Sequence, residues 1–103
     1  MKSASTLAIA LFGSPTAALD HQPIHIGRRK AVALLAYLAV TQRRQSRAHL
    51  AALLWPAYDE TGGRAELRRA LSALNQALGA GWLDADRHSV ALNSTPGLQV
   101  DVL

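Results

Sequence analysis

The sequence predicts a single α+β domain over residues 1–103. Three stretches with the apolar spacing of helices lie between short amino-terminal stretches of strand type and two further strand-like stretches near the end. Half of the residues are apolar and cysteine is absent, so we expect one hydrophobic core without disulfide bonds. We divide the domain into a β-meander (residues 1–27), a three-helix core (residues 28–79) and a hairpin with a final strand (residues 80–103).

The amino-terminal part is predicted to form a small antiparallel sheet. Residues 5–12 alternate large and small apolar side chains, which is the period of a strand, and Gly13-Ser14-Pro15 should end it. A short strand at residues 17–19 follows. The turn Asp20-His21-Gln22-Pro23 should then lead to a third strand at residues 24–26.

The same amino-terminal stretch has weak features of a secretory signal. Met1 and Lys2 precede an apolar run and a group of small residues, but the run at residues 7–12 is short for that purpose. We therefore favour a strand. No stretch approaches the length of a membrane-spanning helix, and we expect a cytoplasmic protein that does not enter membranes.

Two helices should follow Gly27. The first, at residues 29–41, has a broad apolar face made of Ala31, Leu34, Leu35, Leu38 and Ala39. Residues 42–45 form a linker. Ser46 is a good N-cap for the second helix, which runs from Arg47 to Leu54 or Trp55 and is stopped by Pro56.

The third helix carries different chemistry on its two faces. We expect a loop at residues 57–63 and a helix from about Arg64 that ends at Gly79, a suitable left-handed C-terminal residue. At about 100° per residue, its leucines form one narrow stripe. The opposite arc contains no acidic residue and consists of Arg64, Asn75, Arg68, Ser72, Gln76 and Arg69. Such an arc suits DNA, although solvated charges on a surface helix have the same pattern.

The carboxy-terminal stretches complete a recognisable layout. Residues 82–85 and 89–92 should pair around a turn at residues 86–88, and residues 98–102 should form a last short strand. Three helices followed by a hairpin are the layout of a winged helix-turn-helix domain. In that fold the third helix enters the major groove and the hairpin, or wing, reaches a neighbouring groove or the DNA backbone.

The charge distribution favours a polyanionic partner. The formal net charge is +4, and no carboxylate occurs between Asp20 and Asp59, an interval that contains six Lys and Arg residues. We assign base contacts to Arg64, Arg68, Ser72, Asn75 and Gln76. Phosphate contacts are assigned to Arg43, Arg44, Ser46, Arg47, Arg69, Arg87 and His88.

Five runs of the sequence occur in the order found in one family. RRKAVALLAYLAV, SRAHLAALLWP, RAELRRALSALNQALG, WLDADRHSVALN and LQVDV together resemble the bacterial SARP-like and AfsR-type regulators. The chain is similar to their amino-terminal OmpR/PhoB-type winged-helix domain, which precedes a bacterial transcriptional activator domain. The resemblance implies that this chain is excised from a longer regulator and binds promoter DNA, with tandem or dimeric binding on DNA repeats as an option.

The resemblance also implies a contact with RNA polymerase through the loop after the second helix, at Pro56, Ala57, Tyr58, Asp59 and Glu60. One departure concerns the end of the third helix, where family members often have further basic residues and this chain has Asn75 and Gln76. That difference lowers the expected nonspecific affinity and alters base preference.

Other functions have less support in the sequence. The main alternative is a winged helix that docks a protein partner in a multidomain ATPase or signalling protein, because a fold does not determine its function. We do not expect an enzyme, since no catalytic motif is present. We also expect no cofactor and no metal site: His21 and His25 lie four residues apart, but Pro23 separates them and no third ligand is near.

Overall fold

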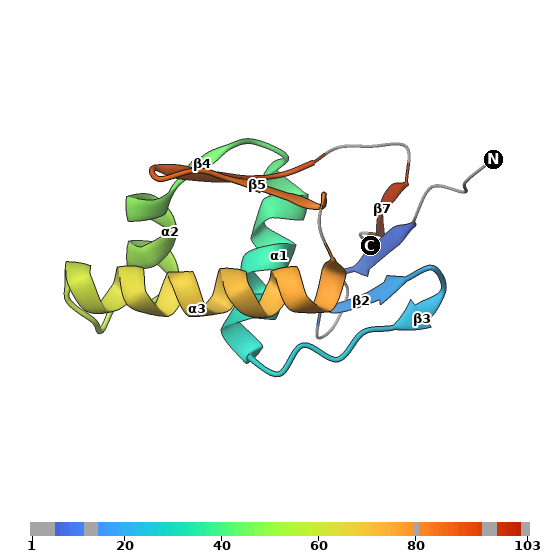
Figure 1. Cartoon of the computed structure of the whole chain (residues 1–103), viewed down its shortest axis with the longest axis horizontal. Coiled ribbons are helices and arrows are strands. Elements are labelled where there is room, and N and C mark those ends of the chain that lie inside the picture. The colour runs from blue at the N-terminus through green and yellow to red at the C-terminus, as the bar shows by residue number, and fades with distance from the viewer. Residues whose placement is uncertain (1–5, 12–14, 80, 94–96, 102–103) are drawn as a thin grey trace.

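The computed structural model describes residues 6–11, 15–79, 81–93 and 97–101, with only the backbone of Asp101. This part of the chain forms an α+β domain with three helices and two small sheets (Figure 1). No helix in it is long and apolar enough to cross a membrane. The elements in chain order are β1 (Leu7–Ala10), β2 (Thr16–Leu19), β3 (Gln22–Pro23), α1 (Arg29–Thr41), β4 (Gln45–Ser46), α2 (Arg47–Leu54), α3 (Glu60–Leu78), β5 (Leu83–Ala85), β6 (Ser89–Leu92) and β7 (Leu98–Asp101).

The first sheet is mixed and has the strand order β3-β2-β1-β7. Its first three strands form the predicted antiparallel meander. No partner was predicted for the last strand, and the sheet as a whole is mixed because β7 pairs with β1 in the parallel direction. The Leu7 N–H donates to the carbonyl oxygen of Gly97 at 2.8 Å, just where this pairing begins. The two ends of the described chain therefore lie side by side (Figure 1).

The third strand lies earlier than predicted, at Gln22–Pro23 rather than at residues 24–26. Asp20 and His21 have φ angles of 51° and 69°, so two residues suffice to reverse the chain and pairing resumes at once. The Asp20 carboxylate accepts a 2.7 Å hydrogen bond from the Thr6 N–H, which holds this turn against the start of β1. Pro23 lies on the outer strand of the sheet, where a missing N–H costs no ladder bond.

The second sheet contains a strand that the sequence did not predict. Its order is β4-β6-β5, and all pairs are antiparallel. The predicted hairpin strands are present as β5 and β6. However, Gln45 and Ser46, which we expected in a linker and at a helix cap, also pair with Val90 and Ser89. This pairing links the α1–α2 connection to the hairpin.

The predictions for α1 and α2 are confirmed. The first helix spans the predicted residues, and its five predicted core residues are buried. The second begins at Arg47, and the Ser46 hydroxyl accepts a 3.0 Å hydrogen bond from the His49 N–H, as an N-cap does.

The third helix begins at Glu60, so the predicted loop at residues 57–63 and the start at Arg64 were wrong. Asp59 caps the helix, because its carboxylate accepts a 2.7 Å hydrogen bond from the Gly62 N–H. Gly63 is buried where α3 meets α2, and a Cβ atom there would lie 3.4 Å from the Ala51 Cβ. This glycine therefore allows close packing of the two helices instead of breaking one of them.

The end of α3 also differs from the prediction. Gly79 has a positive φ of 84°, but its ψ of 172° lies outside the left-handed helical region. This combination is open essentially to glycine alone. The chain consequently leaves the helix in an extended direction and turns toward β5.

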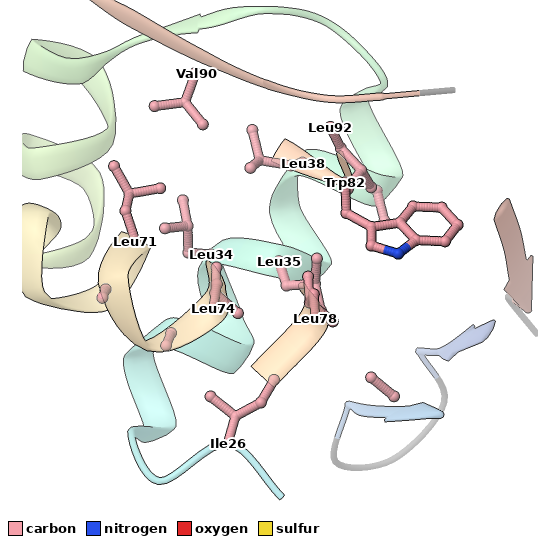
Figure 2. Close-up of a cluster of buried hydrophobic side chains, with 14 of the residues drawn as sticks. Ile26, Leu34, Leu35, Leu38, Leu71, Leu74, Leu78, Trp82, Val90 and Leu92 are labelled. Carbon is pink, nitrogen blue, oxygen red and sulfur yellow. The ribbon is translucent and has the colours of Figure 1, made fainter. Parts of the chain in front are cut away.

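The core lies around α1, between α3 and the second sheet (Figure 2). Figure 2 shows leucines of α1 and α3 together with Val90 and Leu92 of β6 pointing into one shared interior. Trp55 and Trp82 are each 7% exposed and belong to this cluster. Full burial of one leucine or valine side chain in this core contributes roughly 1.5–3 kcal/mol.

Several predicted boundaries fall outside the described residues. They are the ends of the first strand at residues 5 and 12, the strand-ending residues Gly13 and Ser14, the segment at residues 94–96 before the last strand, and the end of that strand at Val102.

We expect the Asp59→Ala substitution to lower the free energy of unfolding by about 1 kcal/mol, because the first turn of α3 then loses its cap. Urea unfolding followed by far-ultraviolet circular dichroism measures this loss. Asp59→Asn is the matched control, since an asparagine oxygen can still accept from the Gly62 N–H. Equal stability of the Asp59→Ala variant and the original chain would show that the cap is not needed.

Candidate nucleic-acid interface

The two faces of α3 lie as the periodicity predicts. Its four leucines and Ala70 are buried against the rest of the domain. All six residues of the predicted polar arc are exposed: Arg64, Arg68, Arg69, Ser72, Asn75 and Gln76. One side of the helix is therefore free of contact with the core.

Four of these polar residues line a shallow hollow together with residues from two other elements. Arg68, Ser72, Asn75 and Gln76 of α3 face Arg47 of α2 and Ala85 of β5 around a volume of about 410 Å³. Of the described residues that line it, none is acidic. The hollow brings guanidinium, amide and hydroxyl groups together, which are the groups that bind phosphates and the edges of bases.

Two residues of the arc lie apart from this hollow. Arg69 donates a hydrogen bond of 2.6 Å to Glu66, one helical turn earlier, so its charge is partly neutralised. Arg64 is exposed one turn before Arg68 and is not part of the lining. The sequence assigned five of the six residues to bases and Arg69 to phosphate, whereas the structure groups only four of them with the start of α2.

The start of α2 is bound to the tip of the β5–β6 hairpin. The Arg47 N–H donates to the His88 carbonyl oxygen at 2.8 Å, and the Arg47 Nε donates to the Asp86 carbonyl oxygen at the same distance. These bonds leave the two terminal nitrogens of Arg47 for another ligand. Ser46, a predicted phosphate ligand, uses its hydroxyl oxygen to cap α2.

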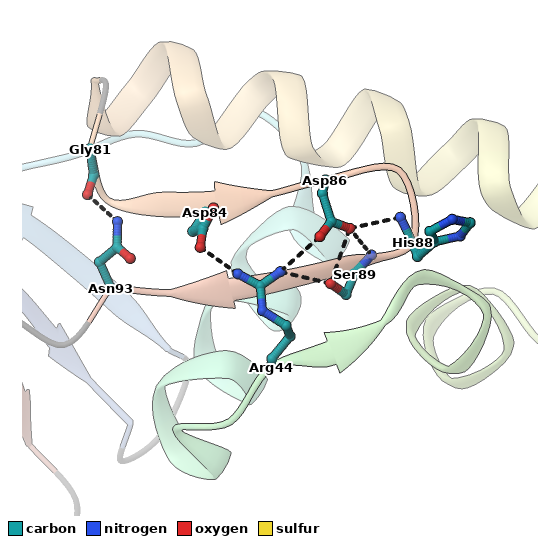
Figure 3. A network of polar contacts seen from close by, with 7 residues as sticks. All are labelled: Arg44, Gly81, Asp84, Asp86, His88, Ser89 and Asn93. Carbon is teal, nitrogen blue, oxygen red and sulfur yellow. Dashed lines mark hydrogen bonds and ion pairs between the residues drawn. The ribbon is translucent and has the colours of Figure 1, made fainter.

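Arg44 is a predicted phosphate ligand whose guanidinium the structure directs toward its own domain (Figure 3). It forms an ion pair with Asp84, donates to the Ser89 hydroxyl at 2.7 Å, and lies 3.5 Å from a carboxylate oxygen of Asp86. These partners are 40 to 45 residues away along the chain, so local spacing carries no signal for them.

Asp86 organises the tip of the hairpin (Figure 3). One carboxylate oxygen accepts hydrogen bonds from the N–H groups of His88 and Ser89, both at 2.8 Å, and from the Ser89 hydroxyl at 3.1 Å. The two backbone bonds lower the pKa of the Asp86 carboxyl below its ordinary value, and they outweigh the opposing effect of desolvation. The Ser89 hydroxyl and the positive charge of Arg44 lower it further.

The remaining predicted phosphate ligands are exposed at the edges of this face. Arg87 and His88 lie in the hairpin turn, and Arg43 lies in the connection between α1 and β4. The connection and the hairpin are adjacent, because Gln45 pairs with Val90 and Arg44 reaches Asp84. Basic residues from two distant parts of the sequence are therefore brought to neighbouring elements.

The predicted polymerase-contact residues form a separate surface at the other end of α2. Pro56, Ala57, Tyr58, Asp59 and Glu60 are all exposed, although Glu60 belongs to α3 and Asp59 caps it. All of them except Ala57 border a second hollow of about 320 Å³, beside which Tyr58 is 53% exposed.

No model of a known protein family matches the chain, and no curated protein sequence matches it. A function therefore has to be inferred from the side chains and from the arrangement in which the fold holds them.

We expect the Asp86→Asn substitution to destabilise the domain at neutral pH and to have little effect in strong acid. Because the folded-state pKa of Asp86 is lowered, its carboxylate stabilises the fold above the unfolded pKa. That contribution disappears as the pH falls below about 4 and through the folded-state pKa. Melting temperatures of the two proteins between about pH 7 and about pH 2 should converge on acidification. A difference that is independent of pH would contradict this role.

Proposed function

We propose that the domain binds double-stranded DNA sequence-specifically, as the DNA-binding part of a bacterial transcription regulator. The observation that carries the proposal is the hollow in which Arg68, Ser72, Asn75 and Gln76 of α3 face Arg47 of α2. Three helices followed by a hairpin that is bound to the second helix support the interpretation as a winged helix-turn-helix domain.

In this proposal α3 enters the major groove with its polar arc toward the bases. Arginine can bind guanine through two hydrogen bonds, and asparagine or glutamine can bind adenine in the same way. Arg68 and Asn75 are exposed on this arc, and the leucines on the opposite side hold the helix to the core. The major groove of B-DNA is wide enough to admit one α-helix such as α3.

Phosphate contacts are assigned to the groups that border the groove-facing helix. Arg47 uses its Nε for the contact with the hairpin, and Arg43 is exposed in the connection between α1 and β4. Arg87 and His88, at the tip of the hairpin, form the proposed wing contact with the DNA backbone. The two sets adjoin each other, because Arg47 is hydrogen-bonded to the backbone of Asp86 and His88.

The loop between α2 and α3 is proposed as a contact with RNA polymerase. This assignment comes from the resemblance to SARP-like and AfsR-type regulators. The exposed ring of Tyr58 and the neighbouring acidic groups provide a surface suited to a protein rather than to DNA. It is separate from the hollow of α3, so both contacts can form together in the proposed complex.

We expect DNA affinity to fall steeply with salt, because each phosphate contact releases counterions. Selection from a random duplex pool supplies the ligand, and fluorescence anisotropy at several salt concentrations measures binding.

Arg68→Ala should weaken binding of the selected duplex by about 1–3 kcal/mol, because Arg68 is a proposed base contact. Arg29→Ala is the matched control, since it removes the same charge from an exposed residue at the start of α1, outside the hollow. Affinity that is insensitive to salt would instead favour docking of a protein partner.

Asn75→Ala should relax the preference for one base pair of the selected site rather than weaken all duplexes alike. The asparagine amide is exposed in the hollow and can bond to a base edge, whereas alanine cannot discriminate between bases. Repeating the selection with the variant tests this, and Arg43→Ala, a proposed phosphate contact, should weaken every sequence to a similar extent. An unchanged sequence preference would remove Asn75 from the base contacts.

A further inference from the structure

The β5–β6 hairpin has two carboxylates close to the proposed DNA-binding face. Asp84 and Asp86 are both exposed, and Ala85 between them lines the hollow. Uncompensated carboxylates at this position would repel the phosphates of a duplex. The same hairpin contributes Arg87, a proposed phosphate ligand. Some other group must therefore offset the negative charge if the hairpin is to approach DNA.

Arg44 is held where it offsets that charge. Its Nη2 pairs with Asp84, while its Nη1 donates to Ser89 and lies near Asp86 (Figure 3). Both ends of the guanidinium fork are thus turned toward the hairpin, and a two-point contact with a phosphate would require breaking these bonds. The formal charges of Arg44, Arg87, Asp84 and Asp86 add up to zero, so Arg44 brings the hairpin to local charge balance.

The contacts of Arg44 also connect to Arg47. Arg44 lies near one carboxylate oxygen of Asp86, and the other oxygen holds the turn through His88 and Ser89. The carbonyl oxygens of Asp86 and His88 in this turn each accept a hydrogen bond from Arg47. A chain of contacts therefore runs from the α1–β4 connection through the hairpin tip to an arginine that lines the hollow.

We propose that Arg44 is a positioning residue of the hairpin: it masks the Asp84 and Asp86 carboxylates and holds the hairpin tip beside Arg47, without binding phosphate itself. The DNA part of this inference rests on the proposed function. It replaces the sequence-based assignment of Arg44 to phosphate with a role that acts through other residues.

The decisive experiment compares Arg44→Gln, Asp84→Asn and the double variant with the selected duplex. Arg44→Gln should weaken DNA binding by about fivefold, the size expected from loss of an exposed ion pair. The double variant should recover part of the lost affinity, because it removes the unpaired Asp84 carboxylate but does not restore the contact of Arg44 with Asp86. Continued weak binding by the double variant would overturn the proposal, since a phosphate ligand cannot be replaced by removal of a carboxylate.

Salt dependence provides a readout that a general loss of stability would not change. Arg43→Gln is the matched control, because Arg43 is the neighbouring exposed arginine and a proposed phosphate ligand. It should reduce the slope of log affinity against log salt by about one unit, whereas Arg44→Gln should leave that slope nearly unchanged. A reduced slope for Arg44→Gln equal to that of Arg43→Gln would identify Arg44 as a phosphate ligand and contradict the inference.

Amide hydrogen exchange separates this inference from the proposed function. Arg44→Gln should accelerate exchange of the His88 and Ser89 N–H groups, both bonded to Asp86, while Arg43→Gln should not. If the original chain binds no duplex, the proposed function fails, and the exchange result alone decides whether Arg44 positions the hairpin. Unchanged exchange in Arg44→Gln would overturn the positioning role in either case.

Discussion

The burial of one side of α3 against α1 is the constraint on which the rest of the structure depends. Leu67, Leu74 and Ala70 are at most 1% exposed, so the rotation of this helix about its own axis is determined by the core. Turning the helix would expose several leucines, each at a cost of roughly 1.5–3 kcal/mol. The polar residues between these leucines therefore have to point outward, whatever partner they serve.

A second constraint is the attachment of the hairpin to the start of α2. An isolated two-stranded hairpin is at best marginally stable in water. Here β4 adds a third strand, and Arg44 and Arg47 bind the tip through side-chain contacts. The hairpin is thereby held beside the polar arc of α3, and residues of α2, α3 and β5 lie on one surface.

The distribution of charge on that face differs from the distribution along the sequence. The arginines between Asp20 and Asp59 look like one basic cluster, yet their side chains serve different purposes in the folded chain. Arg44 is paired with carboxylates and Arg47 is bound to a backbone carbonyl. Arg43 is exposed. Counting basic residues therefore overstates the positive charge available to a polyanion, and the pairing of each arginine has to be known.

Local patterns were sufficient to predict the three helices, their buried faces, the Ser46 cap and the hairpin, because apolar spacing and capping depend on residues within a few turns. The glycines before Arg64 misled the prediction, since Gly63 is required by the close approach of Ala51 from another helix, which the local pattern does not record. The parallel pairing of β7 with β1, the strand β4 and the partners of Arg44 were decided by the tertiary structure alone. Each joins residues about 40 or more positions apart, and no local periodicity records such a contact.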